Sequence, residues 1–424
     1  MKSIVLFGAG KSAICLIDYL SKICTERQWI LTIGDSDLDS LKKKLGNAPS
    51  VNSVQVNVQN REERNTLIQK ADLVISLLPP SLHILIARDC LTNAKNLLTA
   101  SYVDEDIRKL EVGILDKNLF FLCEMGLDPG IDHMSAMKII HSIHSKGGKI
   151  TVFRSHTGGL VAPESDDNPW HYKISWNPAN VVKAGSAGAI FKEKGKIKKL
   201  TYEDLFEKTG LVEIKPLGQY AYYPNRDSLA YIPVYGLESA HSFIRTTLRH
   251  PVYCAGWKNL VKAGLTNDSS PLPSSVKTLA EWSKPLLTYL EDSNKYLYDS
   301  LGIFENRPIP AGADTSAKIL QVLIEEKWKM KSSDRDMILM LHEFEYEWKH
   351  ESQFLKSSLV VKGENDLRTA MAKTVGLPLG IAAKLILEGK MPLKGLHIPI
   401  IPEIYEPVLD ELAMEGIRFK EEFN

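Results

Sequence analysis

The sequence contains few cysteines, and none are spaced as a metal or disulfide pair. Its 424 residues include five cysteines, which stand singly at positions 15, 24, 90, 123 and 254. The number is odd and no CxxC pair occurs, so the pattern argues against a disulfide framework and a cysteine zinc site. Isolated thiols are typical of a reducing compartment, and we expect a cytoplasmic protein.

The sequence also lacks an excess of charge and a long apolar run. Lys and Arg number 52, as do Asp and Glu, so the formal net charge is zero. A neutral chain is a poor candidate for nucleic-acid or anionic-membrane binding, because both need a basic surface. No run of about eighteen apolar residues occurs, so no membrane-spanning helix is expected. The apolar run at residues 4–7 is too short for a signal peptide, because Gly8 ends it.

The remaining composition is that of a large globular protein. Apolar residues make up 44% of the chain and charged residues 25%, which is typical of soluble domains. The length favours about two to three domains and a core that needs no metal or disulfide to fold.

Residues 1 to about 125 alternate short apolar segments with amphipathic ones. The expected strands are residues 4–7, 29–34, 51–58, 73–78, 96–100 and 119–123. The expected helices are residues 11–23, 38–45, 61–70 and 84–92. Alternation of this kind predicts the α/β class, with a Rossmann-like parallel sheet covered on both faces.

From about residue 126 the pattern changes to that of an α+β domain. Short strand-like segments rich in Tyr, Trp and Thr occur at 149–160, 170–176, 211–217 and 231–235. Residues 337–348 and 354–362 are expected to form a hairpin, whose first strand could pair across a homodimer. Residues 366–387 are expected to be helices interrupted at 376–378. A strand at 396–401 and a helix at 402–415 complete the tail.

The clearest motif lies between the first expected strand and helix. It consists of Gly8, Gly10, Lys11, Ser12 and Ala13, in the G-x-G-x-x-A form. A dinucleotide site needs glycine at the tight turn, glycine where the backbone approaches the pyrophosphate, and a small third residue for helix–strand packing. The helix start also offers N–H groups and a positive dipole to phosphates.

Asp35 ends the second expected strand and extends the cofactor prediction. An acid there accepts hydrogen bonds from the adenosine ribose and repels a 2′-phosphate, which favours NAD over NADP. The alternative is that Asp35 only caps the next helix. Further cofactor contacts are expected at strand exits, where open α/β sheets bind ligands; these are Asn57, Val58, Leu77, Leu78 and Pro79.

Blocks of sequence along the whole chain resemble saccharopine dehydrogenases of the glutamate-forming kind, the saccharopine reductase family. The resemblance extends in particular to the dehydrogenase half of bifunctional aminoadipic semialdehyde synthase. The matching blocks include LVISLLP at 73–79, TASYV at 99–103, GLDPGIDHM at 126–134, GGLVAPE at 158–164, NPWHYKISW at 168–176, YPNRDS at 223–228, RTTLR at 245–249 and TAMAKTVGLP at 369–378.

The resemblance implies an NAD(P)-dependent oxidoreductase of lysine metabolism. Saccharopine would lose hydride from the carbon that bears its secondary amine, and the imine would be hydrolysed to L-glutamate and 2-aminoadipate 6-semialdehyde, or the reverse. It also implies that residues 1–125 with 391–424 form the dinucleotide domain. Residues 126–390 would form an α+β domain for substrate binding and dimerisation, and closure on binding both ligands is expected.

The resemblance also implies a set of site residues. Asp128 and Tyr102 are the expected proton-transfer groups, and His133 is a further candidate whose alternative is a first-turn residue of a helix. The substrate has three carboxylates, for which guanidinium and hydroxyl groups are suited. The expected substrate contacts are Ser101, Tyr102, Asp128, Ser175, Arg226, Thr247 and Arg249.

Several positions depart from the family pattern. Thr157 stands where relatives have a cysteine by the active site, and His156 replaces an aromatic residue, which predicts a titratable group near the pocket. Pro80 replaces a tyrosine, and Thr246 replaces a glycine. These changes leave two alternatives open: a related enzyme that joins another amine and aldehyde, as in the polyamine branch, and a non-catalytic NAD(P)-binding regulator. No histidine has metal-ligand spacing, so no metal is predicted.

Overall fold

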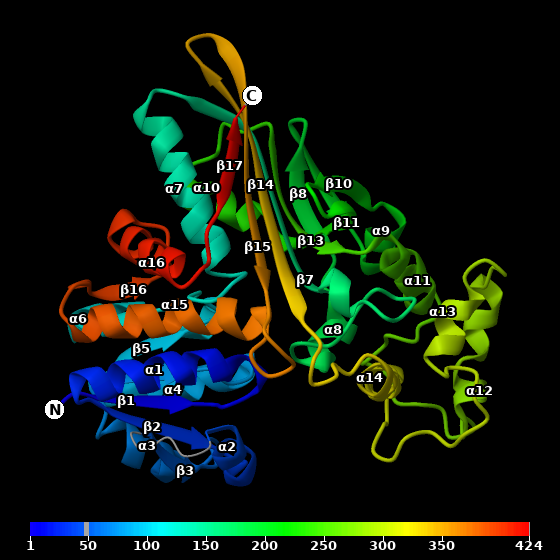
Figure 1. Ribbon diagram of the computed structural model, residues 1–424, viewed down its shortest axis with the longest axis horizontal. Helices are drawn as coiled ribbons and strands as arrows, with labels where there is room; N and C mark the ends of the chain where they lie inside the picture. The colour runs from blue at the N-terminus through cyan, green and yellow to red at the C-terminus, as the bar shows by residue number, and fades with distance from the viewer. Residues whose placement is uncertain (46–50, 424) are drawn as a thin grey trace. The chain divides into compact units, whose positions relative to one another are not determined.

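The computed structural model describes residues 1–45 and 51–423 of the chain (Figure 1). They form two compact units. The first contains residues 1–142 and 367–418, and the second contains residues 143–366 and the tail from Phe419. The division differs from the expected one, because residues 126–142 and 367–390 belong to the first unit and the last residues belong to the second.

The first unit is built on a parallel sheet, as the sequence predicts. Its described strands run in the order β16-β6-β5-β4-β1-β2-β3, and every neighbouring pair is parallel. The strands are β1 (Ser3–Phe7), β2 (Ile30–Asp35), β3 (Val51–Gln55), β4 (Leu73–Ser76), β5 (Asn96–Thr99), β6 (Phe120–Leu122) and β16 (Gly395–His397). The α/β prediction is therefore confirmed, including a strand contributed by the C-terminal segment.

Helices alternate with these strands along the chain. They are η1 (Lys11–Ala13), α1 (Ile14–Arg27), α2 (Leu38–Leu45), α3 (Arg61–Ile68), η2 (Pro80–Leu82), α4 (His83–Thr92), α5 (Glu105–Arg108), α6 (Glu111–Asp116), α7 (Ile131–Ser145), α15 (Ala370–Leu387) and α16 (Pro402–Met414). The central strands β1 and β4 are apolar and buried on both faces, whereas β3 at the end of the sheet is partly exposed. This arrangement brings the carboxyl ends of β1, β2 and β4 to one sheet edge.

Helix α15 is continuous, so the predicted interruption at residues 376–378 is wrong. Pro378 lies inside the helix, and burial of an apolar helix outweighs the hydrogen bond that proline removes. Gly376 and Gly380 allow close packing on α1. A Cβ added at Gly376 would lie 2.8 Å from the Leu16 nitrogen, and one added at Gly380 would lie 2.6 Å from the Tyr19 ring. The helix is apolar enough to span a membrane by composition, but 72% of it is buried in the protein.

The second unit contains a mixed sheet of longer strands. Its described strands follow the path β10-β11-β13-β7-β14-β15-β17, with β8, β9 and β12 attached beside it. They are β7 (Lys149–Val161), β8 (Ala189–Glu193), β9 (Lys196–Leu200), β10 (Gly210–Ile214), β11 (Gly218–Pro224), β12 (Arg226–Asp227), β13 (Ser242–Arg249), β14 (Asp336–Trp348), β15 (Glu351–Lys362) and β17 (Lys420–Phe423). The predicted hairpin is confirmed as β14–β15.

Three details of this unit differ from the sequence prediction. Residues 231–235 are helical, at the end of η4 (Leu229–Tyr231) and in α10 (Ile232–Tyr235), because Pro233 suits a helical first turn better than a strand. Residues 170–176 form a buried loop with a single bridge, from Ile174 to Lys329. Strand β14 pairs with β7 on one edge and β15 on the other, so it has no edge left for pairing across a dimer.

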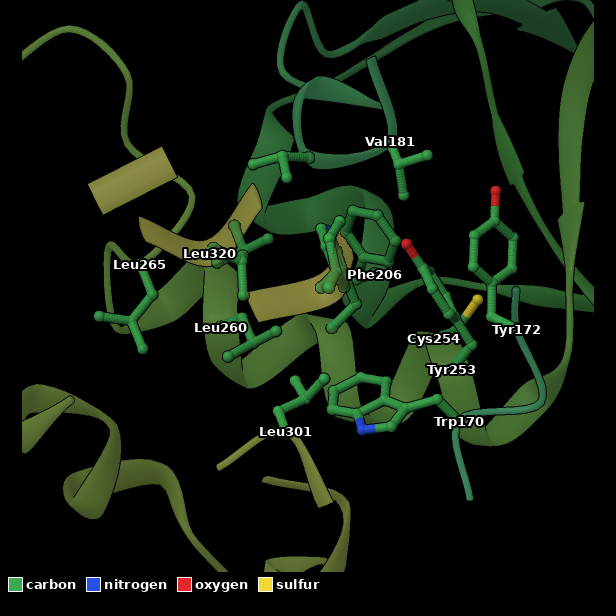
Figure 2. Packing of buried hydrophobic residues seen from close by; sticks show 14 of the residues in the cluster. Trp170, Tyr172, Val181, Phe206, Tyr253, Cys254, Leu260, Leu265, Leu301 and Leu320 are labelled. Atoms are coloured by element: carbon green, nitrogen blue, oxygen red, sulfur yellow. The ribbon is translucent and has the colours of Figure 1, made fainter. Parts of the chain in front are cut away.

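Helices and loops of the second unit enclose an aromatic core (Figure 2). They are η3 (Pro163–Ser165), α8 (Pro178–Lys183), α9 (Tyr202–Glu207), α11 (Pro251–Lys262), α12 (Leu279–Trp282), η5 (Lys284–Tyr289), α13 (Lys295–Ser300) and α14 (Ser316–Lys327). Tyr253 stacks on Trp257 with ring centroids 5.1 Å apart. The Trp170 indole donates to the Leu297 carbonyl over 2.8 Å, so this buried polar group is satisfied.

Candidate active site

The phosphate loop has the geometry that its glycines predict. Gly8 has φ 97°, and a Cβ there would lie 2.5 Å from the Leu77 carbonyl oxygen. Ala13 is fully buried at the start of α1. Between them, Gly10 is exposed, and a Cβ there would meet nothing within 4 Å. The loop therefore leaves open space beside Gly10, next to a helix start, as a dinucleotide phosphate requires.

The two glycines predict different defects when each is changed to alanine. Gly8→Ala is expected to destabilise the protein by about 1–3 kcal/mol, because its φ is left-handed and the carbonyl is close. It should also weaken cofactor binding. Gly10→Ala should keep the wild-type melting temperature and lose only cofactor affinity. Thermal melts and cofactor fluorescence titrations would check both, and equal melting temperatures for the two variants would contradict the assignment.

Asp35 is half-buried at the end of β2 and is bonded to the phosphate loop. Its Oδ2 accepts the Ala9 backbone N–H over 2.6 Å, and its Oδ1 accepts the Asp37 N–H over 2.9 Å. Asp35 is therefore not the cap of α2, whose Leu41 N–H is bonded to the Asp37 carbonyl. The carboxylate lies beside the loop, and its role toward the ribose stays a prediction.

The other predicted cofactor contacts lie at two further strand exits of the same sheet edge. Leu77 and Leu78 are half-buried after β4, followed by the exposed Pro79. Asn57 and Val58 follow β3. The Val58 carbonyl accepts from Arg64 over 2.6 Å, and Arg64 forms a buried ion pair with Asp89 at 2.7 Å. This ion pair was not predicted, because its partners are 25 positions apart in helical segments.

Tyr102 and Asp128, the predicted proton-transfer groups, are in contact in the first unit. The Tyr102 hydroxyl donates to Asp128 Oδ1 over 3.0 Å, and both residues are half-buried. Tyr102 follows β5 and Asp128 follows β6, so both come from the carboxyl edge of the parallel sheet. A phenol hydrogen-bonded to a carboxylate can pass a proton to or from a neighbouring amine or water.

His133 is fully buried in α7, the helix that follows Asp128. Its Nε2 lies 2.9 Å from Glu124 Oε2, and its Nδ1 lies 3.8 Å from Asp132 Oδ2. The second Glu124 oxygen accepts the Val103 N–H over 3.0 Å. The contacts link the segment after Tyr102 to the helix that follows Asp128, and the role of His133 stays a prediction. Glu124 was not predicted, because a single acid after a strand has no distinctive pattern.

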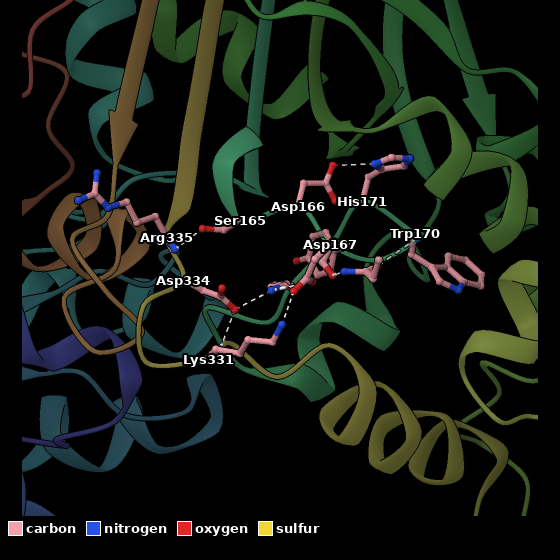
Figure 3. A network of polar contacts seen from close by, with 11 residues as sticks. Ser165, Asp166, Asp167, Trp170, His171, Lys331, Asp334 and Arg335 are labelled. Carbon is pink, nitrogen blue, oxygen red and sulfur yellow. Dashed lines mark hydrogen bonds and ion pairs between the residues drawn. The ribbon is translucent and has the colours of Figure 1, made fainter.

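Ser175, a predicted substrate contact, lies in a buried loop of the second unit. Two residues before it, the buried Lys173 ammonium lies 2.6 Å from Asp334 and 2.8 Å from Asp167 (Figure 3). Lys331 pairs with Asp167 at 2.6 Å, and its backbone N–H donates to Asp334. Hydrogen bonds from the two lysines hold the pKa of Asp167 below its usual range. The network fastens the Ser175 loop to the segment before β14.

Thr247 and Arg249 share one face of β13, because they are two residues apart in a strand. The guanidinium of Arg249 is buried, with its Cζ 5.2 Å from the Tyr172 ring centroid and 5.6 Å from that of Tyr253. Its Nη1 donates to the Leu248 carbonyl, while its Nε has no partner among the described residues. A buried guanidinium with an unused donor is suited to a carboxylate.

The Tyr223 hydroxyl is also buried without a described partner, and burial raises its pKa. Tyr223 pairs with Thr247 in the sheet register, so it lies on the same face. Arg226 is exposed at the start of β12, with φ 49°. The predicted substrate residues of the second unit thus come from β12, β13 and the loop after β7.

Two of the departures from the family pattern, His156 and Thr157, lie on opposite faces of β7. Thr157 pairs with Thr247 in register and shares its face. His156 faces the other side, where its Nδ1 lies 2.7 Å from the Thr246 hydroxyl and its ring lies 4.7 Å from that of Tyr222. The predicted titratable group near the pocket is therefore on the face opposite Thr247, because successive residues of a strand alternate.

Glu343 completes the His156 cluster. Its Oε2 lies 3.4 Å from His156 Nε2, and its Oε1 pairs with Lys356 at 3.0 Å. Burial opposes ionisation of this carboxyl, but the bonds from His156 and Lys356 prevail and lower its pKa to about 2.

Across residues 1–45 and 51–423, no three His, Cys, Asp or Glu side chains are grouped to hold a metal.

Two models of known protein families together match most of the chain. Residues 4–119 match the model of the saccharopine dehydrogenase NADP binding domain, and residues 126–417 match that of the saccharopine dehydrogenase C-terminal domain. The saccharopine dehydrogenase [NADP(+), L-glutamate-forming] of Schizosaccharomyces pombe is 30% identical over 100% of this chain and 99% of its own length.

Two further comparisons agree. The Arabidopsis thaliana alpha-aminoadipic semialdehyde synthase is 32% identical over 99% of this chain, but the match covers 44% of that protein. The chain thus spans about half the length of the first curated relatives that it matches. The solved structure of apo saccharopine dehydrogenase (L-Glu forming) from Saccharomyces cerevisiae superposes with a TM-score of 0.88, covering 100% of both chains at 29% identity.

Proposed function

The chain belongs to the saccharopine dehydrogenase family, and from this premise we propose that it catalyses the NAD(P)-dependent oxidation of saccharopine. The products are L-glutamate, 2-aminoadipate 6-semialdehyde, reduced cofactor and a proton, with one water consumed. The reverse direction is reductive condensation of the glutamate amine with the aldehyde. The observation that supports it best is the Tyr102–Asp128 hydrogen bond in the dinucleotide-binding unit.

The first unit supplies cofactor binding and proton transfer in this proposal. The loop from Gly8 to Ala13 would hold the pyrophosphate of the dinucleotide, which would supply the hydride acceptor when bound. Oxidation of the carbon–nitrogen bond requires a neutral amine, and hydrolysis of the imine requires an activated water. Asp128, with Tyr102 bonded to it, accepts the proton from the amine or the water.

The second unit supplies recognition of the substrate carboxylates. Arg226 and Arg249 provide cations, and Ser175 and Thr247 provide hydroxyls. Arg249 is the best supported, because its buried Nε has no described protein acceptor. The three carboxylates of saccharopine favour this substrate over a polyamine, which would bring positive charge to these guanidinium groups.

We also propose that NAD is preferred over NADP, although the similar yeast enzymes are named for NADP(+). The Asp35 carboxylate lies beside the phosphate loop and would repel a 2′-phosphate. Ser36 and Asp37, which follow it, provide no cation.

Asp35→Asn tests this preference, because it removes the charge and keeps one acceptor oxygen. We expect the kcat/KM ratio for NADP over NAD to rise about tenfold, or about 1.4 kcal/mol. Asp37→Asn changes a neighbouring exposed acid in the same way and should leave the ratio unchanged. A wild-type enzyme that already prefers NADP would contradict the role given to Asp35.

The proposed reaction is tested by following cofactor reduction with L-saccharopine, with NAD and NADP in parallel. A carboxylate-free polyamine, tested in the same assay, distinguishes this proposal from the alternative of an enzyme that acts on another amine. Turnover with saccharopine supports the proposal. A folded protein that binds cofactor and turns over only the polyamine, or neither compound, would refute it.

The proposal includes a cytoplasmic location, which is a prediction from the free cysteines. A homodimer is likewise a prediction. Strand β14 could not form it by pairing with a second copy, because both of its edges are already paired with β7 and β15. A monomer by light scattering at micromolar concentration would refute the dimer.

A further inference from the structure

His83 is a buried histidine of the first unit surrounded by three hydroxyl groups. It is 2% exposed at the first position of α4. Its Nδ1 lies 2.8 Å from the Ser76 hydroxyl and 3.4 Å from that of Thr99, and its Nε2 lies 2.7 Å from that of Ser101. The sequence suggested no role for it, since its partners lie at the ends of two other segments, β4 and β5.

The hydroxyls mark the end of two strands at the edge where the cofactor loop lies. Ser76 ends β4 and Thr99 ends β5, while Ser101 follows β5 and directly precedes Tyr102. Ser76 and Thr99 are fully buried, but Ser101 is half-buried. Of the three, Ser101 is therefore the partner through which His83 would reach a bound substrate.

Burial determines how His83 hydrogen-bonds. Removal from water lowers its pKa to about 4, against a smaller opposing effect of Asp104. The imidazole is then neutral near pH 7, with one nitrogen as donor and the other as acceptor. Both nitrogens are bonded to hydroxyls, and a hydroxyl can be the donor or the acceptor, so two arrangements satisfy the same atoms.

The two arrangements give Ser101 opposite roles. If Nδ1 carries the proton, it donates to Ser76, the Ser101 hydroxyl donates to Nε2, and the Ser101 oxygen presents lone pairs. If Nε2 carries the proton, it donates to Ser101, whose own O–H is then available as a donor. The first arrangement suits a substrate N–H, and the second suits a carboxylate or carbonyl oxygen.

We propose that His83 is a positioning residue that sets whether the Ser101 hydroxyl donates to or accepts from the bound amino-acid substrate. The inference rests on the proposed function, because it takes Ser101 as a substrate contact. It adds that the substrate group present at Ser101 selects one of the two tautomers of His83, which hold the same number of protons and are bonded to the same hydroxyls.

The alternative is that His83 only fills the core, and two conservative variants separate these roles. The amide of His83→Gln reaches the Nε2 position and keeps the Ser101 contact. The amide of His83→Asn reaches only the Nδ1 position, keeps Ser76 and leaves Ser101 unsupported. We expect His83→Gln to keep kcat/KM for saccharopine within about threefold of wild type and His83→Asn to lose about tenfold or more, with unchanged cofactor affinity.

A double-mutant cycle with Ser101→Ala gives the second measurement. If His83 acts through Ser101, adding His83→Asn to Ser101→Ala should cause little further loss of activity. His141→Gln is the matched control, since His141 bonds a tyrosine hydroxyl, that of Tyr405, over 2.8 Å in the same unit. It should leave kcat and KM unchanged.

Each outcome bears on the inference separately from the proposed reaction. Equal activity of the two His83 variants, or additive losses in the cycle, would overturn it while wild-type turnover of saccharopine stands. Absence of wild-type turnover would refute the proposed function instead. If the His83 variants fail to fold, Ser76→Ala carries the test: it removes the hydroxyl that is bonded to Nδ1 in both arrangements, and a kcat/KM equal to wild type would overturn the inference.

Discussion

Replacing Asp128 with asparagine is expected to lower kcat by about 10²–10⁴-fold, the range typical of lost acid–base catalysis. Asparagine has nearly the same shape and can still accept the Tyr102 hydrogen bond that Asp128 accepts over 3.0 Å. The substitution removes the charge and the basicity, so the fold and the cofactor affinity should stay as in wild type. Steady-state kinetics with saccharopine, together with a cofactor titration, would measure the two effects separately.

Asp104→Asn is the matched control for this variant. Asp104 belongs to the same unit and caps α5 by accepting the Ile107 N–H over 2.8 Å, a bond that asparagine can also accept. Its kcat should equal that of wild type. An Asp128→Asn enzyme within about threefold of wild-type kcat would show that Asp128 is not the proton acceptor.

Replacing Lys173 with methionine is expected to cost about 3–5 kcal/mol of unfolding free energy, the usual result of removing one partner of a buried ion pair. The Lys173 side chain is 3% exposed and its partner Asp334 is 8% exposed, so the Asp334 charge would be left buried. The 165–176 loop should loosen with it. Chemical denaturation followed by tryptophan fluorescence would measure the loss, since Trp170 lies in this loop.

Lys331→Met provides the comparison within the same network. Lys331 pairs with the same Asp167 but is 70% exposed, and exposed ion pairs contribute only about 0–1 kcal/mol. Similar losses from the two lysine variants would mean that burial does not govern this network. A Lys173→Met protein as stable as wild type would refute the buried pair.

Much of the fold is predictable from local pattern because the first unit is repetitive. Continuous apolar runs such as that of β4 occur where a parallel strand is covered on both faces. The G-x-G-x-x-A loop is defined by the conformation of Gly8, which a short motif reports. These features depend on residues that are adjacent in the chain, so they can be predicted from a single sequence.

Two features were predicted wrongly, one because of tertiary packing and one because of a proline at a helix start. Pro378 suggests a helix end, yet the packing of Gly376 and Gly380 on α1 holds α15 as one helix. The aromatic segment 231–235 suggests a strand but is helical. In the first case burial outweighs a local preference of about 3 kcal/mol, and in the second Pro233 favours a helical first turn.

The residues of the candidate site also include some that could be predicted from the sequence and some that could not. Tyr102 and Asp128 lie in blocks that resemble the family, so they could be predicted, and the structure brings them together. Glu124 and His83 could not be predicted, because each is a single polar residue whose partners are distant in sequence. His156 was expected near the pocket, but strand alternation places it on the face opposite Thr157.

The measurement that tests the central claim most directly is the stoichiometry of the reaction with L-saccharopine. Purified protein is incubated with saccharopine and NAD, and reduced cofactor and free L-glutamate are quantified in the same sample. The account predicts one glutamate for each cofactor reduced, and neither product when saccharopine is omitted. Cofactor reduction without glutamate, or no reduction by a folded protein that binds cofactor, would contradict it.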